Sequence, residues 1–238
     1  MIKKHLSIIW GTKKNAIIPE AVTGFSVNEL DRNHPIIQLQ EQVGAHSIIF
    51  NHQVHGTIGH IIHNKETIGT TLLTEEGDFL ITNQPGIALG ILTADCLPLI
   101  MYHPEKHLVA LIHAGWKGAV QGVIQKAIDS LKKEYAIDPA SLTVLCGPAA
   151  QACCYQVKDD FYTHFKDDPN KPNYFETREG KLFFSLSAYA NGILDSYGIP
   201  TYQRDFSAHC CTICSTDYYS YRKDKKTEYR NITLVSLK

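Results

Sequence analysis

The stretch IALGILTADCLPLIMYHPEKHLVALIHA, residues 87–114, decides the fold. It holds three short apolar runs, at 87–92, 97–103 and 108–114, and turn residues separate them, so each run predicts a β-strand. All three runs are apolar on both faces, which is typical of strands that other layers cover on both sides. We therefore expect a core built around a central, fully covered sheet.

Four more strands are predicted by similar runs: 47–51, 57–62, 78–82 and 142–146. Three helices are predicted as well: 119–135, 156–165 and 186–197. The first is the strongest prediction, because its apolar residues recur with helical spacing from Val120 to Tyr135. Strands and helices alternate irregularly, which favours an α/β (α+β) fold, a layered sandwich of mixed β-sheets flanked by helices. No linker divides the chain, so residues 1–238 are expected to form a single domain.

Composition excludes several classes of function. With 23 Lys plus Arg against 24 Asp plus Glu, the formal net charge is -1, so no global field attracts nucleic acid or an anionic membrane. The apolar run LSIIW (6–10) is too short for a signal-peptide core or a membrane span. Seven cysteines are an odd number, and a chain this long needs no disulfide staples, so reduced thiols or metal ligands are expected. These features predict a cytoplasmic protein with no nucleic-acid and no membrane partner.

Metal-capable residues lie beside glycine or proline at the ends of three apolar strands: NHQVHGT (51–57), TADCLP (93–98) and LIHAGWKG (111–118). A strand that breaks into a turn directs its last side chain into a cleft, and glycine lets the backbone approach a ligand. His55, Cys96 and His113 would supply two imidazole nitrogens and one thiolate, a common donor set for zinc with an open fourth position. The separations of these residues match no zinc-finger spacing, so a packed cysteine and two structural histidines remain an open alternative.

Two neighbouring positions have equally open interpretations. Asp95 is either a turn-forming residue that bonds nearby backbone N–H groups or a proton shuttle beside Cys96. The helix start after HAGW could hold an anion, with Lys117 adding positive charge. The alternative is that the glycines only make a tight strand-to-helix turn and that Lys117 is solvated.

The segment SAHCCTICSTDYYSYRKD (207–224) concentrates four further metal-capable residues: His209, Cys210, Cys211 and Cys214. They lie within six positions of one another and two cysteines are adjacent, which is unlike the spaced patterns of iron–sulfur clusters. Spacing alone therefore gives only a weak indication of a second metal site. The tyrosines of this segment are expected in the core or in a pocket wall, because the neutral net charge argues against a nucleic-acid stacking surface.

Five motifs, taken together and in order, resemble the YfiH-like laccase-domain family: QVHG (53–56), TADCLP (93–98), HAGWKG (113–118), CGPAAQACCYQV (146–157) and YYSYRKD (218–224). Members of that family are described as multicopper polyphenol oxidoreductases and as purine nucleoside phosphorylases with adenosine deaminase activity. The resemblance implies a four-layer fold of mixed sheets, with His55, Cys96 and His113 as zinc ligands. It also implies adenosine, inosine and methylthioadenosine, with phosphate, as substrates of a monomer or homodimer.

Catalytic and binding roles follow as expectations from this resemblance. Cys96, His113 and Asp95 are the expected catalytic residues, since a zinc-activated water could deaminate adenine while Asp95 moves a proton. Lys117 and Arg222 are the expected phosphate ligands. Either Tyr155 or Tyr221 could stack on the purine, with core packing as an equal alternative for both.

The chain also departs from the family pattern. Family members usually have Gly-Trp-Arg-Gly where this chain has Lys117, and lysine keeps the charge but loses the planar fork that grips phosphate. The N-terminal part, 1–46, is abbreviated, although GFSVNE (24–29) resembles a family segment. Arg32 is the only arginine before Arg178, and whether it takes the role of the family's N-terminal arginine stays open.

Two competing enzyme functions use the same residues. The first is copper-dependent polyphenol oxidation, since two histidines and a cysteine can also take up copper. None of the 12 histidines lies two residues from another, however, so the His-X-His pairs of multicopper oxidases are missing. The second is a hydrolase that edits amino acids in peptidoglycan precursors, with Cys96 as a thiolate nucleophile paired to His113.

Overall fold

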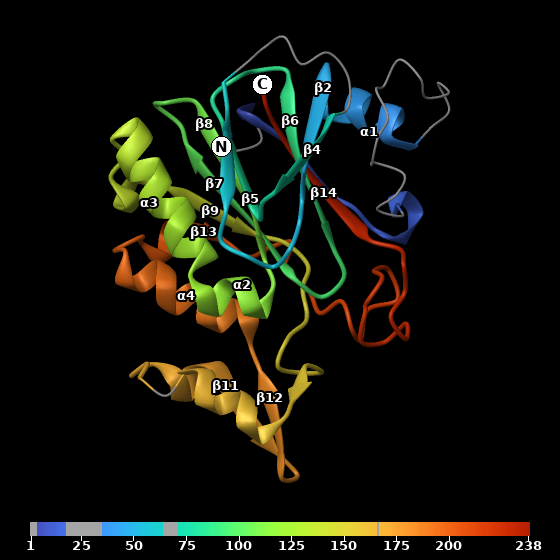
Figure 1. Ribbon diagram of the computed structural model, residues 1–238, viewed down its shortest axis with the longest axis vertical. Coiled ribbons are helices and arrows are strands. Elements are labelled where there is room, and N and C mark those ends of the chain that lie inside the picture. Colours follow the sequence, from blue (N-terminus) through green and yellow to red (C-terminus); the bar gives the residue numbers. More distant parts are fainter. Residues whose placement is uncertain (1–3, 18–34, 64–70, 166) are drawn as a thin grey trace.

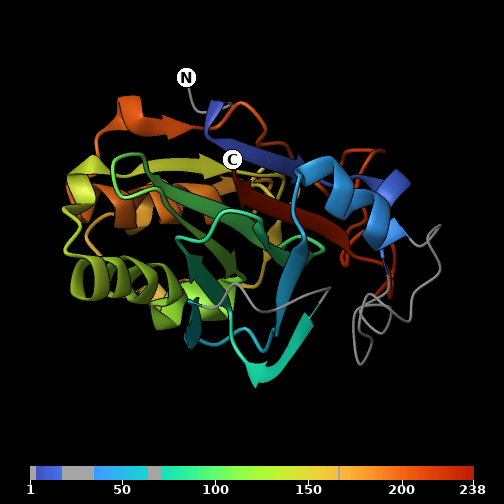
Figure 2. The ribbon, with the colours of Figure 1, turned by 90° about the horizontal axis from the view of Figure 1, so that it is seen from above.

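The computed structural model describes residues 4–17, 35–63, 71–165 and 167–238, with only the backbone given for 71–74. The segment GFSVNE (24–29) and Arg32 lie outside the described residues. Two mixed sheets stack face to face and helices cover both outer faces, which makes four layers (Figures 1 and 2). The expected sandwich of mixed sheets is therefore confirmed.

One mixed sheet has five strands in the order β1 (Leu6–Trp10), β14 (Asn231–Leu237), β6 (Ile87–Thr93), β2 (Ser47–His52) and β4 (Thr71–Glu76). β1 pairs antiparallel with β14, with Leu6 opposite Leu237, so the two ends of the chain share one strand pair (Figure 1). Helix α1 (Pro35–Val43) covers the outer face of this sheet, because Ile36, Leu39 and Val43 pack on it.

The second mixed sheet has six strands in the order β13 (Arg204–Asp205), β9 (Thr143–Cys146), β7 (Leu97–His103), β8 (Leu108–Ala114), β5 (Phe79–Thr82) and β3 (Gly59–Ile62). β7 and β8 form a hairpin whose turn spans residues 104–107. Alternate residues of β7 face opposite layers: Leu99 and Met101 pack under the helices, whereas Ile100 and Tyr102 pack against the five-stranded sheet. The three strands predicted from 87–114 are present and buried, but they do not share one sheet, because β6 belongs to the five-stranded sheet and β7 and β8 belong to the six-stranded sheet.

The outer face of the six-stranded sheet lies under α2 (Trp116–Gln121), α3 (Val123–Tyr135) and α4 (Leu186–Ser196). The continuous helix predicted at 119–135 is wrong at its start, because Gly122 has a left-handed φ of 99° and separates α2 from α3. The prediction of 186–197 is confirmed by α4, whose N-cap Ser185 accepts a hydrogen bond from the backbone of Ala188. Within the described residues, no helix is both long and apolar enough to cross a bilayer.

The helix predicted at 156–165 is also wrong. The chain forms β10 (Gln156–Val157) and then a 3-10 helix, Asp159–Phe165. Together with β11 (Phe175–Arg178) and β12 (Lys181–Phe184), β10 makes a small antiparallel sheet that projects from the main body in Figure 1. Phe161 and Phe165 pack their rings against Phe184 at 5.1 and 5.2 Å, so aromatic packing overrides the helical pattern. Among the described residues there are also four shorter 3-10 helices: Lys13–Asn15, Pro139–Ser141, Lys171–Tyr174 and Thr201–Gln203.

Candidate active site

Strand alternation brings two of the predicted ligands to the same layer. Val109 and Leu111 of β8 face the core between the two sheets, and His113 continues this face at the end of the strand. His113 is the register partner of Pro98, and Cys96 lies two residues before Pro98, just before β7 begins, so its side chain continues the same face. Both side chains therefore reach the end of the sandwich between the sheets.

His55, Cys96 and His113 meet at this end. Each offers one ligand atom, and these atoms all lie within 4.8 Å of one another. The Sγ of Cys96 is 3.6 Å from Nε2 of His55, and the two imidazole rings are 4.8 Å apart at an interplanar angle of 75°. His113 is buried, Cys96 is half-buried and His55 is exposed, so the group opens towards solvent on the His55 side.

Asp78 holds two of these residues in place. Its Oδ1 accepts hydrogen bonds from Nδ1 of His113 at 2.7 Å and from the backbone of His55 at 3.0 Å, while Oδ2 accepts one from Gly56 at 2.6 Å. A carboxylate only accepts, so the Nδ1 atom of His113 carries the proton and Nε2 is left for a metal. From the sequence, Asp78 was predicted only as the first residue of the strand 78–82. The available signal was an acidic residue at the start of a strand whose other residues are mostly apolar and are buried.

Two glycines of HAGWKG allow close packing around the ligands. A Cβ on Gly115 would lie 2.6 Å from Cδ2 of His55 and 3.0 Å from Sγ of Cys96. A Cβ on Gly118 would lie 2.8 Å from the carbonyl oxygen of Gly56. The helix start is thus packed against the loop that carries His55, which supports the tight-turn interpretation of these glycines.

The charges of the site are strongly coupled. Burial raises the pKa of the Cys96 thiol, but His113 and His55 outweigh this effect and lower the pKa to about 6. Burial lowers the pKa of His113, but Cys96 and Asp78 outweigh it and raise the pKa to about 9. Burial likewise acts to raise the pKa of Asp78, and the hydrogen bond and charge of His113 bring it below its usual range. Between about pH 6 and about pH 9 the metal-free site therefore holds a thiolate beside an imidazolium.

A cavity of about 690 Å³ opens above these residues, a size typical of small-molecule sites. All eight predicted site residues line it: His55, Asp95, Cys96, His113, Lys117, Tyr155, Tyr221 and Arg222. Residues that sequence analysis did not single out line it too, among them Asn51, Gln53 and Arg230. The side-chain amide of Gln53 exchanges two 2.8 Å hydrogen bonds with the backbone of Leu92, so it fixes the wall beside β6.

Asp95 lies in the turn that separates β6 from β7. Its φ is 87°, and the side chain is almost fully buried. Oδ1 accepts a hydrogen bond from the hydroxyl of Thr212 at 2.7 Å, and Oδ2 accepts one from the backbone N–H of Arg222 at 2.9 Å. Its carbonyl oxygen accepts another from Ala150 at 2.9 Å. Asp95 thus joins its own turn to two distant segments of the pocket wall.

Positive and aromatic side chains form a further part of the cavity wall. The guanidinium of Arg222 lies 4.7 Å from the ring centroid of Tyr155, and its Nη1 donates to the carbonyl of Gln156 at 2.7 Å. Lys117 is exposed, with Nζ 5.9 Å from the ring of Trp116. Tyr155 is buried, whereas Tyr221 is 45% exposed.

The structure keeps only part of the second candidate cluster, which the sequence placed at 209–214. His209 donates a hydrogen bond from Nδ1 to the carbonyl oxygen of Gly147, at 2.8 Å, and among the described residues it joins no metal-capable group. Cys211 and Cys214 instead meet Cys153 and Cys154, with all four sulfurs within 4.8 Å of one another. The sequence spacing of 209–214 alone could not reveal this pairing with another segment.

Known proteins resemble this chain over most of its length. Residues 26–238 match the family described as "Multi-copper polyphenol oxidoreductase laccase". A protein of Aquifex aeolicus named purine nucleoside phosphorylase is 38% identical over 160 residues, which cover 67% of this chain and 70% of that protein. Another with that name, from Clostridium acetobutylicum, is 28% identical over 239 residues and covers 96% of this chain and 91% of its own length.

Solved structures share the whole fold. The hypothetical protein YfiH of Bacillus licheniformis superimposes with a TM-score of 0.79 at 25% identity, covering 98% of this chain and 93% of that chain. YlmD from Geobacillus stearothermophilus gives a TM-score of 0.76 at 24% identity over 98% and 90% of the two chains. These structures confirm the expected YfiH-like fold.

Proposed function

The chain belongs to the family described as multi-copper polyphenol oxidoreductase laccase, and on that premise we propose that it is a zinc-dependent purine nucleoside phosphorylase that also deaminates adenosine. The observation that carries the proposal is the placement of His55, Cys96 and His113 in a cavity of about 690 Å³ with cationic and aromatic walls. A cavity of this size suits a nucleoside together with phosphate. Adenosine, inosine and methylthioadenosine are the proposed substrates.

The donor set fits zinc. Two imidazoles and a thiolate lie within 4.8 Å, and Asp78 keeps the proton of His113 on Nδ1, away from the coordinating nitrogen. When bound, zinc supplies Lewis acidity that polarises an oxygen of the substrate or of water. The chain itself keeps the donors together, since Gly115 leaves room for His55 and Cys96 to approach each other.

Phosphate binding is assigned to Lys117 and Arg222. Both side chains line the cavity and are exposed, so both are accessible to phosphate. Arg222 uses Nη1 for the carbonyl of Gln156, and a guanidinium has five N–H donors, so several remain for phosphate oxygens. The stacking contact with Tyr155 holds the guanidinium plane in one orientation.

Purine stacking is assigned to Tyr221. The ring of Tyr155 is buried and already contacts Arg222, which favours a supporting role for it. Tyr221 is 45% exposed and lines the same cavity, so its face is accessible to a base. In this arrangement the base lies against Tyr221 and the phosphate against Arg222, its neighbour in the chain.

Deamination requires a proton to move to the departing amino group. Asp95 is the candidate carboxylate beside Cys96, but both of its oxygens already accept hydrogen bonds, from Thr212 and from Arg222. This geometry favours Asp95 as a positioning residue that fixes the turn of Cys96. A role as proton shuttle requires one of these two hydrogen bonds to open.

One product profile tests the proposal. Metal-quantified protein is incubated with adenosine, with and without phosphate, and inosine, hypoxanthine, adenine and ribose 1-phosphate are separated. We expect free base and ribose 1-phosphate only in the presence of phosphate, and inosine or hypoxanthine from deamination. Cys96→Ala should abolish both activities, with Cys210→Ser as the matched control. Full inosine phosphorolysis by a correctly folded Cys96→Ala protein would overturn the scheme.

Copper-dependent phenol oxidation is the first alternative. The donor set of the trio can bind copper, because the affinity order favours that ion. Among the residues that the structure describes, however, neither metal-capable group contains more than two histidines, which is too few for a multicopper cluster. Phenol oxidation measured in zinc-loaded and copper-loaded protein separates the two functions.

A cysteine-dependent hydrolase is the second alternative, and one observation favours it. The lowered pKa of Cys96, about 6, and the raised pKa of His113, about 9, describe an activated nucleophile beside its acid. Such a hydrolase would act on peptidoglycan precursors and would keep its activity after metal is removed with a chelator. The proposed phosphorylase would lose its activity under the same treatment.

A further inference from the structure

We propose that Cys153, Cys154, Cys211 and Cys214 bind a second zinc ion, in a structural site separate from the trio in the cavity. Their four sulfurs already lie within 4.8 Å of one another. A zinc–sulfur distance of about 2.3 Å places the sulfurs of a tetrahedral site roughly 3.8 Å apart, so only a small contraction is needed. Four thiolates at such distances repel one another unless a cation lies between them.

Two backbone turns deliver these cysteines. Cys211 and Cys214 are separated by two residues, the spacing found in many structural zinc sites. Cys153 and Cys154 lie on a turn in which the backbone N–H groups of Cys154 and Tyr155 both donate to the carbonyl of Gln151, at 2.9 and 2.7 Å. In the turn of Cys211 and Cys214, the backbone N–H of Ser215 donates to the carbonyl of Cys211 at 3.1 Å. Each turn is therefore fixed by its own hydrogen bonds.

The two turns are also fastened to each other. Ala149 forms a parallel bridge with Cys211, accepts a hydrogen bond from the backbone of Thr212 at 3.1 Å and donates one to Cys210 at 3.0 Å.

Four protein ligands leave no open coordination position, so the site is structural and not catalytic. Its position explains what it would stabilise. Thr212, between Cys211 and Cys214, donates to the carboxylate of Asp95, and Tyr155, next to Cys154, supports Arg222. The proposed ion would therefore link the turn of Cys96 to the wall that binds phosphate.

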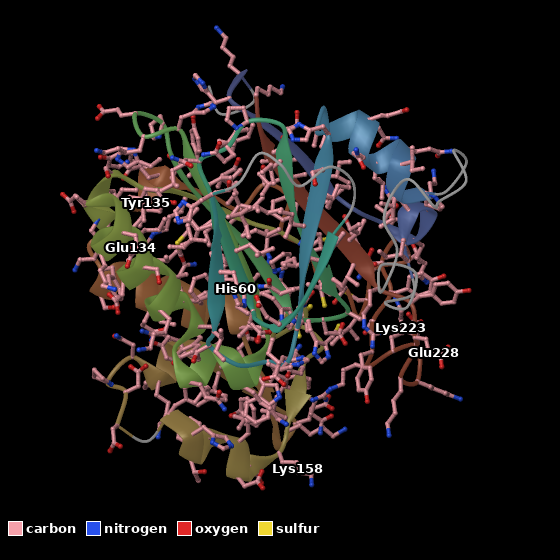
Figure 3. The ribbon with its side chains drawn as sticks, turned by 45° about the horizontal axis from the view of Figure 1, so that its top comes forward. His60, Glu134, Tyr135, Lys158, Lys223 and Glu228 are labelled. Atoms are coloured by element: carbon pink, nitrogen blue, oxygen red, sulfur yellow. The ribbon has the colours of Figure 1, made fainter. Side chains whose placement is uncertain are left out.

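Lys223 reinforces the loop that carries Cys214. Its Nζ donates to the carbonyl oxygens of Thr212, Ser215 and Tyr218 at 3.3, 2.6 and 3.2 Å. Figure 3 shows Lys223 on the C-terminal segment, on the opposite side of the molecule from Glu134 and Tyr135 of α3. These contacts hold the loop in shape and place a positive charge near a site whose four thiolates leave a net negative charge around zinc.

Zinc binding here is a simple exchange: four S–H bonds break, four zinc–sulfur bonds form and four protons are released to solvent. The same sulfurs could instead pair as two disulfides, which would require an oxidant. The proposal does not depend on the phosphorylase activity, because it concerns metal content alone.

The test measures zinc per chain, by mass spectrometry of the metal, in protein purified under reducing conditions. We expect two zinc ions in the wild type and in the matched control Cys210→Ser, one in Cys96→Ala, one in Cys214→Ser and none in the double variant. X-ray absorption of zinc in Cys96→Ala, which does not disturb the four cysteines, should show four sulfurs at about 2.3 Å. A folded Cys96→Ala protein without zinc, with iron instead, with nitrogen ligands, or with a mass that indicates disulfides would overturn the proposal.

Discussion

The Nδ1 atom of His113 donates a 2.7 Å hydrogen bond to the carboxylate of Asp78, and both side chains are buried. The same carboxylate binds the backbone of His55 and Gly56, so one acid couples a ligand at the end of β8 to a loop that follows β2. These elements belong to different sheets. The geometry of the proposed metal ligands therefore depends on a residue outside the trio.

Asp78→Asn should weaken zinc binding by roughly 10–100-fold, because the amide cannot accept all of these hydrogen bonds and no longer fixes the proton of His113. Competition with a chromophoric chelator measures the affinity. Asp160→Asn, an exposed carboxylate of the small sheet's 3-10 helix, is the matched control and should leave the affinity unchanged. An unchanged affinity in folded Asp78→Asn would contradict the assigned role.

Alkylation of Cys96 in metal-free protein should have its midpoint near pH 6, not near the ordinary thiol pKa of about 8.5. The thiolate is the reactive form, so reactivity persists above that midpoint and is lost as the pH falls through about 6. Asp78→Asn should move the midpoint upward, because the imidazolium of His113 loses its partner. Peptide mapping after iodoacetamide treatment measures the reaction at Cys96, and zinc should protect it.

Gly115→Ala and Gly122→Ala should affect different properties: zinc retention in the first and the free energy of unfolding in the second. The Cβ on Gly115 meets His55 and Cys96, so zinc retention should fall sharply. Gly122 has a φ of 99°, and its Cβ would touch only Gln125, at 3.7 Å, so alanine there should lower the free energy of unfolding by about 1–2 kcal/mol and keep zinc. Metal analysis and thermal unfolding of both variants test the pair. Equal zinc content would contradict the prediction for Gly115.

Thr212→Val distinguishes between the two candidate roles of Asp95, which are to position the turn of Cys96 and to carry a proton. Valine removes the hydroxyl that donates to Oδ1 and leaves the carboxylate intact. If Asp95 positions the turn, Thr212→Val and Asp95→Asn should both lower kcat and leave the shape of the pH–rate profile unchanged. The result that contradicts this is loss of one limb of the profile in Asp95→Asn alone, which would identify a proton shuttle.

Lys117→Arg should lower the KM for phosphate, because the planar guanidinium can bind two phosphate oxygens at once. Lys117→Gln should raise it, by roughly tenfold for one lost charge-assisted hydrogen bond. Lys126→Gln, on the exposed face of α3, is the control for charge alone. Steady-state kinetics at saturating inosine give these constants. Equal KM values in all three variants would remove Lys117 from the phosphate site.

The central strands could be predicted because each carries its own signal, being apolar on both faces. β1 and β14 were not predicted. They pair across the whole length of the chain, with Leu6 opposite Leu237, and neither run reveals its distant partner. The broken helix has a local cause as well, since a single left-handed glycine interrupts an apolar pattern that continues on both sides.

The candidate site also contains residues that could be predicted from the sequence and residues that could not. His55, Cys96 and His113 were predicted from strand ends and from the resemblance, and the structure brings them together. Asp78 was not predicted as a site residue, because its hydrogen bonds join the end of β8 in one sheet to the loop that follows β2 in the other. The group of Cys211 and Cys214 with Cys153 and Cys154 was also missed, since a bridge at Ala149 aligns segments that are far apart in the sequence.

In the β7–β8 hairpin, the length of the distant turn at 104–107 determines the geometry of the candidate active site. His113 faces the cavity because it is the register partner of Pro98, and this register is set by the four residues 104–107 at the other end of the strands. An insertion or deletion there that shifts the pairing by one residue would turn His113 and Cys96 towards opposite layers. Evolution of this chain can thus vary the amino acids of that remote turn far more freely than it can vary their number.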